Sequence, residues 1–543
     1  MAGLRPPERD IGVLRAPVRS SIILGGLFLI VVLGLGLFER LGAGGGFAAA
    51  AVIAAALALF ALVGLFAHAR RAADYYVADR SVSGSLGGLS GGAGLVGLIV
   101  VGLAGGALGT PAEIAGASIG LVLGLLLHSV LVAPGLRRSG AYTAGDFLAV
   151  RLGSAWAQAG AAVVVLASSF LLFLVYLKFS APLLATMFGL GADHALYAAA
   201  LSMALAVLPG GMRSLTWASA VQYVTILFAC LLPAGFLTLR GEAALGPGLD
   251  LGALLASVAT PAEGASSQFA LATVAAGFGV ASLGQVTGRA LAARSARESG
   301  TTMLWMLAFT AAAVASGLLT VELLSGTIGA ETAAAARGDL IQLAALFGAL
   351  PAVLAGLLLA GLLAALLAGG QAALFAAATA ISHDIWDEIV DRTGTEGRRI
   401  VVARLAIAGL AGGGVIVARW ETADAAALFG WVLALAAAGL LAPLLAGLWW
   451  RRCNEVGAIA GMAAGFGFTS VILALSLLDP GRDDAIGDWA ALSAPAAGIV
   501  GVLIAFVVSV AASLATPAAE IDLDVESRPD TGRDAPPIRE RPA

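Results

Sequence analysis

The chain contains 543 residues, of which 60% are hydrophobic and 12% charged, and its formal net charge is −4. This number of charged residues is too small for the surface of a soluble protein of this length. Most of the chain is therefore expected to face lipid or other apolar helices. The same figures exclude a largely disordered chain and a nucleic-acid-binding protein. The two cysteines, Cys230 and Cys453, predict neither a disulfide framework nor a metal site, and we expect no cofactor.

Apolar runs long enough to cross a bilayer recur along the chain, about fourteen in all. Because they are continuous and do not alternate polar with apolar residues, they predict transmembrane α-helices and not barrel strands. The sixth run is short, and the tenth is long enough to tilt or bend. The runs are 20–38, 47–68, 86–107, 114–134, 162–188, 195–208, 215–239, 268–288, 302–323, 351–382, 400–418, 424–448, 456–477 and 490–514.

Arginine is distributed unevenly between the two sides that these spans define. With the N-terminus in the cytoplasm, 24 of the 29 arginines lie in cytoplasmic segments. The positive-inside rule therefore predicts a multi-pass protein of the inner (plasma) membrane with both termini cytoplasmic. We interpret the first run as an uncleaved anchor, because a second long span follows it closely. The tail 516–543 is rich in Pro, Asp, Glu and Arg and is expected to be disordered.

Glycine accounts for 72 residues, and several occur in clusters inside the spans. In membrane helices such clusters allow either a local break in the helix, which frees backbone groups for ions and solutes, or close packing of neighbouring helices. The clusters that we consider candidate breaks are Gly87-Gly88, Gly91-Gly92 and Gly105 in the third span, and Gly277, Gly279 and Gly284 in the eighth.

Six short motifs occur in a consistent order between the spans. They are DYYVADR at 74–80, YTAGDF at 142–147, GGMRSLTW at 210–217, GVASL at 279–283 leading to Arg289, AISHDIW at 380–386 and GAIAGM at 457–462. Together they resemble the sodium:solute symporter family, particularly its branch of acetate and other short monocarboxylate permeases, which carries an extra N-terminal helix. The resemblance extends over roughly residues 20–515.

This resemblance implies an all-α core of two five-helix repeats with opposite topology, at 86–239 and 268–448. An N-terminal cytoplasmic segment with two extra helices (1–85) precedes the core, and two C-terminal helices (449–515) and the tail (516–543) follow it. The solute site is expected at mid-membrane, between broken helices 86–107 and 268–288.

The sequence departs from the family pattern at the ion site. The family usually has an aspartate in the first core helix, whereas residues 91–95 read GGAGL. The adjacent hydroxyl pair of the family's sodium site is replaced by Ala368 and Gly369. Because a hard cation requires oxygen ligands, we do not expect strong sodium coupling, and proton coupling remains open. The ion-binding residues are therefore unknown.

Five residues are candidates for solute binding: Lys178, Tyr176, Gln222, Gln285 and Glu113. Lys178, the one lysine of the chain, lies about a turn from the centre of its span, too deep to reach the interface, and could replace a bound cation or pair with a solute carboxylate. Glu113 could gate an outer vestibule or be a solvated loop acid. The two glutamines could bind solute or another helix.

These observations predict a secondary transporter of a small organic solute, with a short monocarboxylate such as acetate as the best candidate and Na⁺ or H⁺ as a possible coupling ion. Its expected partners are the lipid bilayer, the solute and that ion. The alternative is a non-transporting sensor or partner subunit that keeps the scaffold. An enzyme is not expected, because two G-x-S-x-G matches, at 88–92 and 116–120, are explained by the high glycine content.

Overall fold

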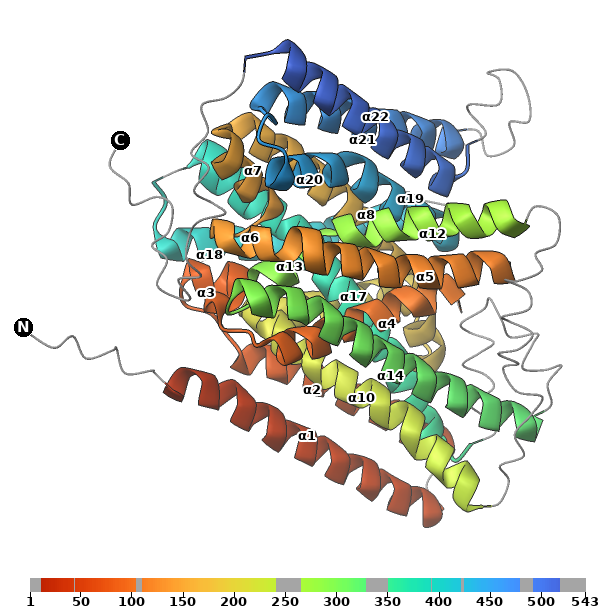
Figure 1. The fold of residues 1–543 in the computed structure, drawn as a ribbon. Helices are drawn as coiled ribbons and strands as arrows, with labels where there is room; N and C mark the ends of the chain where they lie inside the picture. The colour runs from red at the N-terminus through yellow and green to blue at the C-terminus, as the bar shows by residue number, and fades with distance from the viewer. Residues whose placement is uncertain are drawn as a thin grey trace, which may run out of the picture.

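The computed structural model describes the chain except for residues 1–10, 43, 104–109, 241–264, 329–349, 392, 421–423, 479–491 and 518–543. In the described part, twelve helices are long and apolar enough to span a membrane. The bent pair α12 (Ala265–Ser282) and α13 (Gly284–Leu291) makes a thirteenth span, and the shorter apolar α9 (Ala192–Val207) corresponds to the short sixth run. This arrangement confirms the predicted all-α membrane protein (Figure 1).

The remaining helices follow in chain order. They are α1 (Ile11–Arg40), α2 (Gly45–Phe66), α3 (Ala72–Val77), η1 (Ala78–Arg80), α4 (Gly84–Leu103), α5 (Pro111–Leu127), η2 (His128–Val132), α6 (Ala133–Ser139), α7 (Ala144–Leu152), α8 (Ala155–Phe188), α10 (Met212–Leu239), α14 (Ala296–Ile328), α17 (Ala352–Thr379), η4 (Ala380–Val390), α18 (Glu396–Trp420), α19 (Ala425–Ala436), η5 (Ala437–Leu441), α20 (Ala442–Trp449), α21 (Glu455–Leu478) and α22 (Ala494–Ala515). The predicted disordered tail and Gly105 lie outside the described residues, apart from the first two positions of the tail.

The two ends of the helix bundle differ in charge. One end carries Arg70, Arg71, Arg80, Arg137 and Arg138, and we call it the arginine-rich end. Helix α1 begins and α22 ends at this end (Figure 1). Helix α4 runs away from it, whereas α12 and α13 run towards it. The five spans that begin with α4 and the five that begin with α12 therefore have opposite topology, as predicted for inverted repeats.

Helix α17 lies at the centre of the bundle, where it packs against α4, α8 and α10. The extra N-terminal helix α1 lies at the periphery of the bundle, and its last turn is hydrogen-bonded to the start of α17. The Glu39 carboxylate accepts hydrogen bonds from the backbone N–H groups of Ala352 and Val353, at 2.5 and 3.0 Å. These amides belong to the first turn of α17 and have no acceptor within the helix, so the carboxylate caps the positive end of the helix dipole.

Helix α4 is continuous over Gly84–Leu103, so the predicted break in this helix is wrong for the described residues. Its glycines instead allow α14 to approach closely. A Cβ atom added at Gly88 would lie 2.2 Å from the Cβ of Trp305, and one added at Gly91 would lie 2.7 Å from the sulfur of Met306. Packing, the alternative that the sequence left open, therefore explains these glycines.

Three of the core spans contain a π-helical segment. These segments are η2 between α5 and α6, η4 after α17, and η5 between α19 and α20. In η4 the amide of Asp391 donates to the carbonyl of Trp386, five residues earlier, as a π-helix requires. Each segment thus adds a residue to a helical turn inside or at the end of a span.

Candidate functional site

The break between α12 and α13 is confirmed, and it marks the centre of the candidate site. The two helices meet at an angle of 45° at Leu283, which has an extended backbone (φ −61°, ψ 131°). On one side of the break, His128 Nδ1–H donates to the carbonyl of Ala281 at 2.8 Å. On the other, a Cβ added at Gly284 would lie 3.0 Å from Val165 of α8. The break, which belongs to the second repeat, is therefore held by contacts from two spans of the first repeat.

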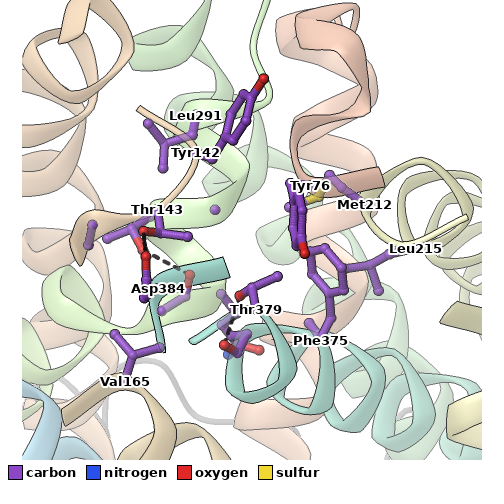
Figure 2. A pocket seen from close by; sticks show the side chains of 17 residues that line it. Tyr76, Tyr142, Thr143, Val165, Met212, Leu215, Leu291, Phe375, Thr379 and Asp384 are labelled. Carbon is purple, nitrogen blue, oxygen red and sulfur yellow. Dashed lines mark hydrogen bonds between the residues drawn. The ribbon is translucent and has the colours of Figure 1, made fainter. Parts of the chain in front are cut away.

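Cavities lie on both sides of this break. The distal cavity, the larger of the two, lies between α4, α5, α12, α14 and α19, away from the arginine-rich end. The proximal cavity lies between α3, α7, α8, α10, α13 and α17, towards the arginine-rich end (Figure 2). A small cavity between α4, α13 and α17 shares Gln285 and Ala372 with the proximal cavity.

A single turn of α4 separates the two sides. Gly94 and Leu95 line the small cavity, whereas Leu98 and Ile99 line the distal cavity. Three residues of α-helix correspond to a rise of about 4.5 Å. The barrier between the two groups of cavities is therefore thin along α4.

Tyr176 of α8 fills the space between α4 and α17 at this barrier. Its side chain is fully buried, and its hydroxyl donates to the carbonyl of Gly94 at 3.3 Å. A Cβ added at Gly369 would lie 2.2 Å from the Cζ atom of Tyr176. Tyr176 therefore fits only because α17 has a glycine at this position.

The positions that would hold the family's hydroxyl pair lie at the same contact. A Cβ added at Gly94 would lie 3.7 Å from Cα of Gly369 and 3.8 Å from the carbonyl oxygen of Ala368. Neither Ala368 nor Gly369 has a side-chain oxygen. The oxygens available here are backbone carbonyls and the Tyr176 hydroxyl, which already donates to one of those carbonyls. This geometry agrees with the expectation of an altered ion site.

A buried polar cluster lies at the mouth of the proximal cavity. The Asp384 carboxylate accepts hydrogen bonds from the Thr143 hydroxyl at 2.5 Å and the Gln158 amide at 3.1 Å. Figure 2 shows Asp384 and Thr143 together on one side of the cavity, with Tyr76 and Phe375 on the other. Residues from α7, α8 and η4 are thus joined around one carboxylate that is 1% exposed.

His383 lies beside this carboxylate, between two tyrosine rings. The ring centroids of Tyr76 and Tyr142 are 5.1 and 5.3 Å from that of His383. Its two nitrogens face acids, with Nε2 3.6 Å from Asp146 and Nδ1 3.7 Å from Asp387, both beyond hydrogen-bond distance. The sequence indicates residues 380–386 only as a family motif, and it does not predict that His383 and Asp384 lie beside the proximal cavity. The available signal was a histidine and two acids within five residues at the end of an apolar run.

The segment η1 between α3 and α4 is strained, and its Arg80 guanidinium lies 5.5 Å from the ring centroid of Tyr142, which lines the proximal cavity. Ala78, Asp79 and Arg80 all have left-handed backbones, with φ of 50°, 51° and 48°, and such strain is concentrated at functional sites. The Arg80 guanidinium donates to the carbonyl of Gly140. Burial lowers the pKa of Arg80, and the nearby Tyr142 and Asp146 partly offset this effect.

Tyr76, on α3 outside the membrane spans, is a neutral group of the cavity wall. Burial raises the pKa of its hydroxyl, and the nearby Asp387 carboxylate adds to this shift. The hydroxyl therefore stays protonated at physiological pH and donates to the hydroxyl of Ser382 at 3.2 Å. The uncharged ring can contact an apolar solute that enters from the arginine-rich end.

The predicted site residues are not gathered in one cavity. Gln285 lines both the proximal and the small cavity, and Tyr176 contacts the edge of the small cavity through Gly94. Glu113 lines the distal cavity and forms a capping box with Thr110 at the start of α5. Gln222 is fully buried in α10, and Lys178 is half-buried in α8, two residues beyond Tyr176. Neither of these two lines the distal, the proximal or the small cavity.

Solved structures of transporters share this fold. A Na⁺-coupled sialic acid symporter, solved in a substrate-bound outward-open state, gives a TM-score of 0.66 at 15% identity and covers 88% of this chain and 99% of its own. Mhp1, a nucleobase-cation-symport-1 family transporter, gives a TM-score of 0.50 at 16% identity and covers 83% and 97%. At these identities the similarity establishes the fold alone, an all-α transporter fold with inverted repeats.

Sequence comparisons identify the family. An uncharacterized symporter of Cupriavidus necator is 31% identical over 182 residues, which span 33% of this chain and only 27% of that relative. A monocarboxylic acid transporter of Corynebacterium glutamicum is 24% identical over 430 residues, or 72% of this chain and 76% of the relative. The family model for the sodium:solute symporter family matches residues 75–465. Because this match covers more than half of the sequence, the chain belongs to the sodium:solute symporter family.

Proposed function

We propose that this symporter-family protein carries a short monocarboxylate across the inner (plasma) membrane, with the arginine-rich end and both termini in the cytoplasm. The observation that carries the proposal is the pair of cavity systems on opposite sides of one turn of α4 and of the break at Leu283. A barrier this thin can open alternately to either side when one repeat moves against the other. A solute held beside it would then reach both compartments without a continuous pore.

Two observations support a short monocarboxylate as the solute. The relative from Corynebacterium glutamicum, of which the match spans 76%, is named a monocarboxylic acid transporter. The wall of the proximal cavity is largely apolar near α13, where Val165, Leu215 and Phe375 line it. Such a wall suits a short alkyl chain better than a sugar, whose many hydroxyl groups would lack partners there.

We further propose that transport does not depend strongly on sodium. Ala368 and Gly369 supply no side-chain oxygen, and Tyr176 occupies the space between α4 and α17. Replacing Na⁺ by choline at constant pH should therefore change the initial rate of acetate or propionate uptake into proteoliposomes by less than about twofold, because a hard cation finds few free oxygens.

An imposed proton gradient should drive the same uptake if protons replace sodium. A loss of most uptake in choline would show that other ligands form a sodium site and would refute this proposal. Proteoliposomes that contain folded protein but take up no monocarboxylate in either medium would instead favour the non-transporting sensor or partner subunit.

Lys178 stays our candidate for the charge that replaces a bound cation. Lys178→Met keeps the length and apolarity of the side chain and removes the charge, so folding and insertion should be preserved while uptake, or its pH dependence, is lost. Lys178→Arg should keep the charge but not exchange a proton, which separates the two roles. If Lys178→Met takes up solute as well as the parent from acid to mildly alkaline pH, Lys178 has neither role.

A further inference from the structure

Arg289 of α13 is a buried cation without a counter-charge in the described structure. Its side chain lies within the bent span, and the residue is 4% exposed. One guanidinium nitrogen donates to the hydroxyl of Ser90 at 2.5 Å, and that hydroxyl in turn donates to the carbonyl of Gly87. None of the ion pairs formed by the described residues includes Arg289. A buried charge without a counter-charge is costly and marks Arg289 as a candidate functional residue, although it lies in the last turn of the span.

Two other arginines, the buried Arg137 and the half-buried Arg404, have a visible structural task. Arg137 donates to the carbonyls of Ala293 and Arg294, and Arg404 donates to those of Leu208 and Pro209. Both therefore fix loops at the arginine-rich end through two backbone acceptors each. Arg289 differs, because its acceptor is a single neutral hydroxyl on α4 and its remaining N–H groups have no acceptor among the described residues.

Gln285 stands beside Arg289 on the same face of α13. The two residues are four positions apart, and both line the small cavity against Gly94 of α4 and Ala372 of α17. The side-chain carbonyl oxygen of Gln285 is buried without a hydrogen-bond partner. A guanidinium and an amide thus face one cavity, next to the break in the helix; the unused group of the amide is its acceptor oxygen, and a half-turn about the last side-chain bond would turn the NH₂ group to that position.

Building on the proposed transport function, we propose that Arg289 and Gln285 bind the carboxylate group of the transported solute. A guanidinium presents two parallel N–H groups that match the two oxygens of a carboxylate, and the NH₂ group of Gln285 can donate to the same anion. The anion supplies the counter-charge that Arg289 lacks. Gln285 lies in the first turn of α13, where the positive end of the helix dipole favours a negative group, whereas Arg289 lies in the last turn.

The surroundings of this pair restrict the solute further. The small cavity continues through Gln285 and Ala372 into the proximal cavity, where Val165 and Leu215 form an apolar wall. In this proposal the alkyl chain of the solute lies against that wall while its carboxylate is at Arg289. No acidic side chain lines the small cavity in the described structure, so an α-ammonium group would find no counter-charge there. The site therefore favours simple monocarboxylates over amino acids.

The test uses purified full-length protein in proteoliposomes, with acetate and propionate as probes and propionamide as the uncharged analogue. We expect the KM for propionate to rise about 30-fold or more in Arg289→Gln, because a charge-assisted bidentate contact is lost. In Arg289→Lys the KM should rise about tenfold, because lysine keeps the positive charge but makes only one contact with the carboxylate. Gln285→Ala should raise KM by about three- to tenfold through the loss of one hydrogen bond. Excess propionamide should not inhibit the parent.

A matched control separates binding from folding. Arg404→Gln removes a half-buried arginine that donates to the carbonyls of Leu208 and Pro209, so it should lower the melting temperature and leave the KM of the folded protein unchanged. If Arg289→Gln does not fold, Arg289→Lys and Gln285→Ala still report KM. Parent-like KM values in these variants would overturn the carboxylate site while leaving monocarboxylate transport intact. A parent protein that neither transports nor binds propionate would overturn the proposed function and this site together.

Discussion

Gly369→Ala should abolish most uptake, because the added methyl group has no room beside Tyr176. The new Cβ would lie 2.2 Å from Cζ and 2.4 Å from the hydroxyl oxygen of Tyr176, whose ring is buried on all sides. Overpacking of this kind costs about 1–3 kcal/mol, and here it forces apart α8 and α17 at the barrier between the cavities. We expect a lower melting temperature and a fall in the initial rate of about tenfold or more.

Two further variants make this result specific. Gly412→Ala adds the same methyl group to an exposed position of α18 with no atom within 4 Å, so it should behave like the parent. Combining Gly369→Ala with Tyr176→Leu removes the clashing ring atoms and should restore part of the melting temperature. If Gly369→Ala alone melts and transports like the parent, Tyr176 does not close the barrier.

Asp384→Leu should prevent most of the protein from accumulating in a folded form. The change leaves the Thr143 hydroxyl and the Gln158 amide buried without an acceptor, and each lost partner costs about 1–3 kcal/mol. Asp384→Asn keeps one carbonyl oxygen that can accept both bonds, so it should fold in far larger amounts. The measurement is the monodisperse fraction after gel filtration, followed by a melting curve.

The control for this pair is an exposed acid. Asp193 pairs with Arg419 at 3.0 Å, and about half of each side chain is exposed. Such a pair contributes about 1 kcal/mol or less, so Asp193→Leu should shift the melting temperature little. Equal yields of Asp384→Leu and Asp193→Leu would show that the buried cluster around Asp384 does not support the fold.

The sequence predicted an all-α membrane protein and the order of its spans, because these depend on the local density of apolar residues; the predicted fourteen spans compare with twelve long helices, one bent pair and the short α9 in the described structure. It also placed the break near Gly284 in the right helix. The predicted break in α4 was wrong, because glycine clusters allow either a helix break or close packing. Only the positions of Trp305 and Met306 on α14 show that these glycines allow close packing.

The candidate site was harder to predict for a different reason. Asp384 meets Thr143 and Gln158 across more than 220 residues of sequence, a distance at which no local pattern operates. Arg289 could be identified as a motif residue but not as an unpaired charge, since that property depends on which side chains fail to reach it in the folded protein. Gln285 was a candidate from the start, because a polar residue beside a helix break is visible in the sequence.

The π-helical segments give the core helices a means of changing register. Each carries one residue more than an α-helical turn needs, and that surplus residue can move along the helix by exchanging hydrogen-bond partners one at a time. Every residue that the surplus residue passes turns by about 100° around the helix axis, and the number of backbone hydrogen bonds in the helix stays the same. Because η4 continues α17 and contains His383 and Asp384, such a shift would turn these side chains relative to the proximal cavity. One end of a central helix can thus present two different faces to the same cavity while its other end remains capped by Glu39.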